Sequence, residues 1–281
     1  MFGRFEMHDL VRDYLYKLGL DMTEEERVWA REQLFDYYEE VATSASRFLA
    51  RSRFTRARTP VFTGAMPEIR DRPQATAWYA ADRDNLVACL DVLTDRPDRQ
   101  VQLAAGAAPY LRHTGPWDLV IRLQSRAVTA ARTIGDREHT YRATLELAVA
   151  QRNHGDYDDA LATLSTLPED ADSLCERGIV HMLLGEYEAA EKAHATALEY
   201  GRAVGELYPV AIALHELGVL RYLQDRYDLA VELLSEAKTV YEQGGHRGRT
   251  CRSAQGSRQR LLLHGQVRRG DRCTTAGARA R

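Results

Sequence analysis

Three short stretches of the sequence decide the fold: GDYDDAL at 155–161, GEYEAAE at 185–191 and DRYDLAV at 225–231. In each stretch a turn is followed by a tyrosine, and an alanine stands three residues after that tyrosine. Residues three apart lie on one face of a helix. Because an amphipathic segment also precedes each turn, the three stretches predict three helix–turn–helix units.

Glycine interrupts the first helix of two of these units, at Gly178 and Gly218. A glycine inside a helix costs about 1 kcal/mol relative to alanine. That cost is expected where another helix must approach the backbone closely. We therefore predict a close helix–helix contact at both glycines.

The pattern resembles the tetratricopeptide repeat, with Leu217-Gly218 on a first helix, Gly185-x-Tyr187 at a turn, and Ala190 and Ala197 on a second helix. The resemblance implies an all-α fold, a tetratricopeptide-repeat α-solenoid built by stacking helix pairs. The expected units are 141–172, 171–202 and 211–242, after a degenerate unit at 101–132, within a helical array over 75–243. An unrelated helical bundle is the alternative.

The composition is that of a soluble globular protein, with 281 residues, 44% hydrophobic residues and a net charge of -3. No apolar run approaches the roughly 18 residues of a membrane helix, and the N-terminus lacks the apolar core of a signal peptide. The four cysteines are too far apart for a disulfide framework or a CxxC metal site. These features favour a cytoplasmic protein with reduced thiols.

The N-terminal half is also predicted to be helical. Thr23-x-x-Glu26 is a capping-box signature, which predicts the start of a long helix. Helical spacing continues in an apolar stripe, Leu34, Tyr38, Val41, Ala45 and Phe48. Residues 51–74 hold three prolines and six arginines and are read as a linker, after which a helix is expected over 75–93.

Two further segments resemble bacterial NB-ARC regulators of the signal-transduction NTPase class. Residues 5–12, FEMHDLVR, resemble the end of their winged-helix domain with its Met-His-Asp motif, and Ala77-Trp78 with 83–87, RDNLV, resembles the segment that introduces their repeats. The resemblance implies that 1–50 is a winged-helix remnant and a long helix. It also implies that His8 matches a histidine that reaches nucleotide phosphates. The chain has no GxxxxGK[ST] loop, so His8 is a cofactor-binding residue only if a nucleotide-binding domain is supplied elsewhere.

The residues give no basis for an enzyme. Nine histidines are scattered without HExxH or CxxC spacing, and neither a GxSxG elbow nor a GxGxxG loop occurs. We therefore predict no catalytic residue, no metal site and no cofactor.

The repeats instead predict a groove that binds a peptide or a protein domain, and carrying over the groove-facing offsets of the family selects eight residues. Arginines among them are suited to clamping a carboxylate, although solvated helix faces are an equal alternative. The selected residues are Arg112, His113, Arg142, Arg152, Asn153, Glu176, His215 and Tyr222.

Residues 244–281 carry ten arginines, no lysine and one acid. Without aromatic residues the segment lacks stacking platforms for nucleic acid, and residues 141–243 are acidic, so nucleic acid is not an expected partner. We predict disorder after about residue 245. Two origins remain open, a genuine basic arm or a frameshifted translation of a gene whose true frame continues the repeats.

Two classes of function follow from the sequence. In the first, the chain is the sensor or interaction part of a truncated NTPase-type transcriptional regulator. In the second, it is a free-standing repeat scaffold or adaptor. The sequence does not indicate an oligomeric state, a particular partner or a regulated pathway.

Overall fold

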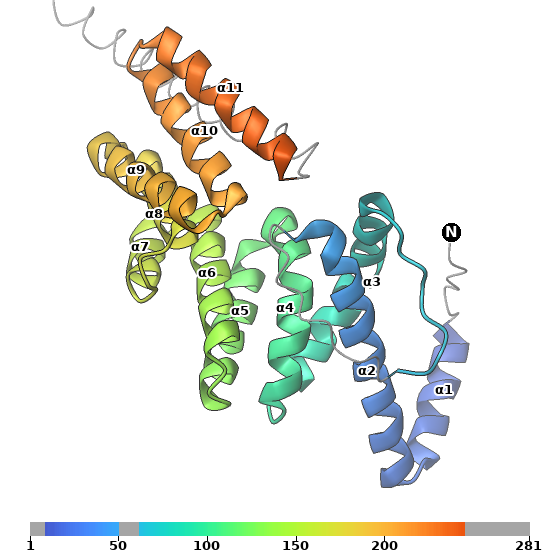
Figure 1. The fold of residues 1–281 in the computed structure, drawn as a ribbon. Coiled ribbons are helices and arrows are strands. Elements are labelled where there is room, and N and C mark those ends of the chain that lie inside the picture. Colours follow the sequence, from blue (N-terminus) through green and yellow to red (C-terminus); the bar gives the residue numbers. More distant parts are fainter. Residues whose placement is uncertain (1–8, 51–61, 245–281) are drawn as a thin grey trace, which may run out of the picture. The chain divides into compact units, whose positions relative to one another are not determined.

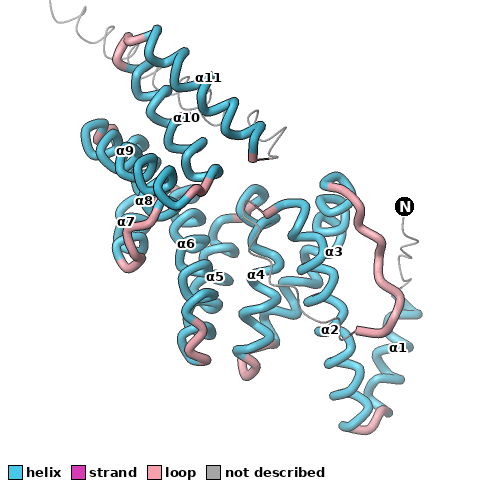
Figure 2. The backbone as a smooth tube through the Cα atoms, in the orientation of Figure 1, coloured by secondary structure: helices cyan, strands magenta, loops and turns pink. Residues whose placement is uncertain are grey.

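A computed structural model describes residues 9–50 and 62–244, and these residues form helices and loops without a strand. The fold is all-α, as the sequence predicts (Figure 2). The chain divides into two compact units, Met1–His154 and Gly155–Arg281. His8, the 51–61 part of the linker and the segment after Gly244 lie outside the described residues.

The first unit holds the helices α1 (Asp9–Asp21), α2 (Glu24–Leu49), α3 (Arg72–Val92), α4 (Pro97–Thr114), α5 (Trp117–Thr133) and α6 (Arg137–His154). Helix α2 packs on α3 and α4, and α4, α5 and α6 then pack on one another (Figure 1). The predicted capping box at the start of α2 is confirmed. The backbone N–H of Thr23 donates to Glu26 Oε2 at 2.8 Å, and the Glu26 N–H donates to Thr23 Oγ1 at 3.2 Å.

The core of the first unit is centred on Tyr79, which α3 places between two other helices. Its hydroxyl donates to the carbonyl of Ala42 on α2 at 2.8 Å and to that of Gly106 on α4 at 2.5 Å. A Cβ on Gly106 would lie 3.0 Å from Ala42 Cβ, so α2 and α4 approach closely at this level. The ring of Tyr79 also stacks on Tyr110, with centroids 5.0 Å apart.

The predicted stripe of α2 is correct for Tyr38, Val41 and Ala45, which are buried, but wrong for Leu34, which is 47% exposed. The buried face begins instead at Phe35. No residue between 13 and 34 is buried, so this stretch adds nothing to the core of the first unit. The buried part of the α2 stripe lies where α3 and α4 pack against that helix.

The second unit holds α7 (Tyr157–Ser165), α8 (Ala171–Leu184), α9 (Tyr187–Val204), α10 (Leu207–Leu223) and α11 (Tyr227–Gln243). Helix α8 packs on α9, α10 packs on α9, α8 and α11, and α7 packs on α8 (Figure 1). Helices α8 and α9 are joined through Gly185, which ends α8 in the left-handed conformation at φ 79°. In the α10–α11 turn Asp225 adopts the same region, at φ 63°.

Both predicted close contacts at glycine are confirmed in the second unit. A Cβ on Gly178 would lie 2.5 Å from the ring atoms Cε1 and Nε2 of His194. A Cβ on Gly218 would lie 2.9 Å from Leu234 Cγ and 3.4 Å from the carbonyl oxygen of Ala230. Each glycine thus lets the second helix of its pair pack against the backbone of the first helix.

Candidate protein-binding surface

The eight predicted groove residues are divided between the two units. Five lie on α4 and α6 of the first unit, and three lie on α8 and α10 of the second unit. We compare the exposure of their side chains, because an exposed side chain can contact a partner whereas a buried one packs between helices.

Arg112 belongs to the second kind, because it is 7% exposed and engaged inside the unit. Its Nε donates to Glu146 Oε2 at 2.8 Å and its Nη2 donates to Glu146 Oε1 at 2.5 Å. Asn153 Nδ2 donates to the backbone carbonyl of Arg112 at 3.4 Å. The arginine clamps a carboxylate of α6, so Arg112 joins two helices of the first unit, and its part in a groove stays a prediction.

Glu176 and His215 are also buried, at 5% and 8% exposure. Nδ1 of His215 lies 3.6 Å from Glu216 Oε1. All positions of α10 from Pro209 to Leu220 are buried, and α8, α9 and α11 pack against this helix. Both residues are thus buried in the structure, and their part in a groove stays a prediction.

The remaining predicted residues are accessible. His113 is exposed at the end of α4, and Arg142 and Arg152 are half-buried on α6. Arg142 Nη2 lies 2.5 Å from Glu138 Oε1, one helical turn away. A solvent-accessible ion pair within one helix contributes little to stability.

Tyr222 is the accessible residue of the second unit, with 47% of its surface exposed at the end of α10. Its ring meets that of Tyr227 edge to face, with centroids 5.5 Å apart. The hydroxyl of Tyr227 donates to Asp225 Oδ1 at 2.9 Å. Sequence reasoning missed this second tyrosine, because its spacing to Ala230 marked it as a packing residue of the turn.

Sequence reasoning also missed an ion pair that joins two repeats. Arg221 of α10 donates through Nη1 and Nη2 to Glu191 of α9, at 2.9 and 2.6 Å. These hydrogen bonds hold the pKa of the Glu191 carboxyl below its usual range. Glu191 is the last residue of the stretch 185–191, but its partner stands thirty residues later, so no local signal connects the two.

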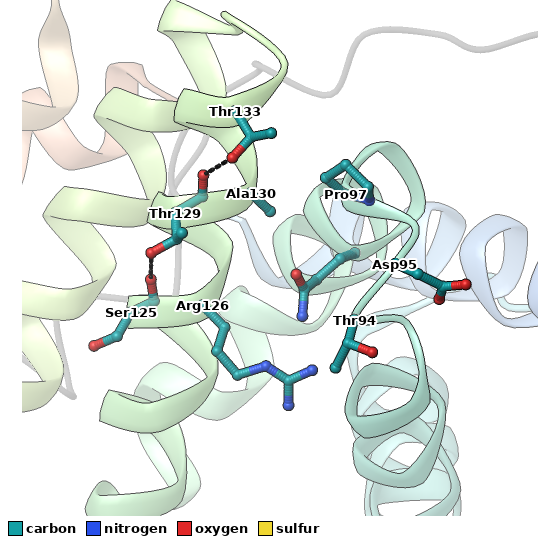
Figure 3. A pocket seen from close by; sticks show the side chains of 9 residues that line it. Thr94, Asp95, Pro97, Ser125, Arg126, Thr129, Ala130 and Thr133 are labelled. Carbon is teal, nitrogen blue, oxygen red and sulfur yellow. Dashed lines mark hydrogen bonds between the residues drawn. The ribbon is translucent and has the colours of Figure 1, made fainter.

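A pocket of about 480 Å³ opens in the first unit between the α3–α4 loop and α5 (Figure 3). Arg126 points into it, but its Nη1 donates to Asp91 Oδ1 at 2.7 Å and its Nη2 to the Leu90 carbonyl at 2.8 Å. Hydroxyls of Thr129 and Thr133 donate to backbone carbonyls one turn earlier on α5. Three of the lining residues, Arg126, Thr129 and Thr133, thus use side-chain donors within the first unit.

Within residues 9–50 and 62–244, no group of three or more histidine, cysteine or acidic side chains is arranged to hold a metal ion. In the same ranges no helix combines the length and the apolar character that a membrane crossing requires.

Residues 169–243 match the family model of the tetratricopeptide repeat, a range that covers α8, α9, α10 and α11. The chain is also similar to the human SH3 domain and tetratricopeptide repeat-containing protein 2, at 29% identity over 148 residues. That alignment covers 49% of this chain and 11% of the human protein, so the chain spans about a tenth of its relative's length. The fold is therefore of the all-α tetratricopeptide-repeat solenoid class, whose members serve as modules for protein–protein interaction.

Proposed function

We propose that this chain is a non-catalytic interaction module that binds a peptide or protein domain on the surface of its repeats. The proposal rests on the stack of α8, α9, α10 and α11. These two helix pairs have the close glycine contacts that the family pattern predicts, and they lie within the residues that match the family model. Stacked repeats of this kind present an extended surface rather than an enclosed pocket.

The accessible residues indicate the chemistry that each unit offers to a partner. Arg142 and Arg152 place guanidinium groups on α6, and Tyr222 places an exposed ring at the end of α10. Arginine binds carboxylates through two parallel hydrogen bonds, and tyrosine supplies apolar area with few rotatable bonds. We infer that the first unit offers its arginines to an acidic group of a partner, and that the second unit separately offers Tyr222 to an apolar or aromatic group.

The proposed context is the interaction part of an NTPase-type transcriptional regulator in the cytoplasm. Support comes from the order of the segments, since Met7-His8-Asp9 leads directly into α1, and α3 carries the buried Trp78 of the Ala77-Trp78 motif. A free-standing repeat scaffold or adaptor is the alternative. The regulator is supported if a neighbouring gene or an upstream reading frame encodes a phosphate-binding loop and its protein product binds this chain. If no such gene or frame exists, the scaffold is favoured.

The binding proposal is tested with the full chain as bait and the variants Arg142→Ala, Arg152→Ala and Tyr222→Ala. Once a retained partner is identified, its affinity for each variant is measured by titration calorimetry. We expect each substitution to weaken binding by about 1–2 kcal/mol, because binding energy concentrates in a few arginine and aromatic residues.

Arg132→Ala is the matched control, since Arg132 is an exposed arginine on α5 outside the predicted surface. Helical circular dichroism verifies that every variant is folded. If all three variants bind the partner as tightly as the control does, the assignment of the surface is wrong.

A further inference from the structure

The α10–α11 turn carries a partly exposed aromatic surface. Tyr222, Tyr227 and Val231 are 47%, 53% and 65% exposed, and we call these three residues the tyrosine patch. Tyr227 and Val231 are four residues apart on α11 and so share one face of that helix. Large apolar side chains that remain exposed together mark a surface that meets another segment.

Acidic groups surround this patch. Asp225 accepts the hydrogen bond of the Tyr227 hydroxyl, and Asp228 and Glu232 are exposed on the first two turns of α11. Residues 222–232 contain these three acids and a single cation, Arg226, so the stretch has a net negative charge. Aromatic ring faces beside carboxylates bind a guanidinium group well, because the rings attract its charge and the carboxylates accept its donors.

The chain itself contains a segment with this chemistry. Residues 245–281 follow α11 directly and hold ten arginines, no lysine and one acid. The 17 residues of α11 span about 25 Å at 1.5 Å per residue. An extended chain covers about 3.3 Å per residue, so roughly eight residues return from the end of α11 to its start. Arginines from Arg252 onward are therefore within reach of the tyrosine patch.

We propose that the arginine-rich segment 252–281 docks on the tyrosine patch of its own chain, with an arginine side chain against Tyr222 and Tyr227 and its charge balanced by Asp225 and Asp228. Docking itself does not depend on the proposed function. One consequence does rest on it: because Tyr222 is also a proposed partner contact, the segment competes with the partner for this surface.

The test follows the motion of the segment in the full chain. A fluorescent dye is attached to Cys273 in a Cys251→Ser background, where the buried thiols Cys89 and Cys175 do not react. Docking holds the dye to the folded unit, so we expect an anisotropy well above that of the same dye on a synthetic peptide of residues 245–281.

Two pairs of substitutions remove the docking surface by different means. Tyr222→Ser with Tyr227→Ser removes the rings, whereas Asp225→Asn with Asp228→Asn removes charge at constant size, and asparagine tolerates the left-handed conformation at 225. We expect the anisotropy to fall toward the peptide value in both. If the serine pair loses its helical circular-dichroism signal, the anisotropy of the asparagine pair alone decides whether the segment docks.

Glu24→Gln with Glu25→Gln is the matched control, because it removes the same charge from exposed positions on α2. We expect this control to keep the anisotropy of the unsubstituted chain. The proposal is overturned if the unsubstituted chain already shows the peptide value. It is equally overturned if the folded asparagine pair keeps the anisotropy of the control.

Discussion

Gly178→Ala tests the reasoning about helix packing most directly, because two opposing effects predict opposite signs. Alanine improves the helix propensity of α8 by about 1 kcal/mol. The new Cβ, however, would lie 2.5 Å from two ring atoms of His194, a side chain with 0% exposure and therefore no room to move outward. Overpacking of a filled core costs about 1–3 kcal/mol. We expect packing to prevail, with a net loss of about 1 kcal/mol.

Urea unfolding of the full chain measures this loss in the second unit alone. All three tryptophans, Trp29, Trp78 and Trp117, precede residue 155, so their fluorescence reports the first unit, whereas circular dichroism reports both. With a urea dependence of about 1.5 kcal/mol per molar, the second unit should unfold about 0.7 M earlier while the tryptophan transition stays in place.

Two further variants separate packing from propensity. In a His194→Ala background the steric conflict is gone, so adding Gly178→Ala should no longer destabilise the unit. Gly218→Ala should cost less than Gly178→Ala, because its new Cβ meets the flexible side chain of Leu234 at 2.9 Å. Stabilisation by Gly178→Ala alone would refute the argument, since propensity would then outweigh the contact.

Four other outcomes are expected. Glu146→Gln removes a carboxylate that pairs with the buried Arg112 and should lower the stability of the first unit by about 2–3 kcal/mol in a tryptophan-detected urea titration; an unchanged midpoint would show that the pair is dispensable. Asp225→Gly should raise the stability of the second unit by about 0.5–1 kcal/mol, because glycine relieves the left-handed backbone at φ 63°. Urea unfolding followed by circular dichroism measures the change, and a loss of stability would mean that the Tyr227 hydrogen bond matters more than the strain. Burial raises the pKa of the Cys89 thiol to about 11. The unfolded chain releases this proton from about pH 8.5, so the first unit should lose stability as the pH rises from about 8.5 to 11. Cys89→Ala should reduce this pH-dependent loss. The purified chain should release no phosphate from ATP, because it has no phosphate-binding loop; turnover that a point substitution in this chain abolishes would contradict the prediction.

The sequence could predict those features that depend on residues close together in the chain. The capping box of Thr23 and Glu26, the turns at Gly185 and Asp225, and the helices that follow them depend on neighbours within one or two helical turns. The glycine contacts were also predictable, because a helix tolerates Gly178 and Gly218 only where something compensates their low propensity.

Only the tertiary structure decided which predicted surface residues are accessible. The family's groove-facing offsets select Arg112, Glu176 and His215, but all three are buried: α6 supplies Glu146 to Arg112, and α8, α9 and α11 pack against α10. Tyr222 stays exposed at the end of that same helix. Helical spacing fixes the direction in which a side chain leaves its own helix, whereas burial depends on helices distant in sequence, and that information is not present in any local pattern.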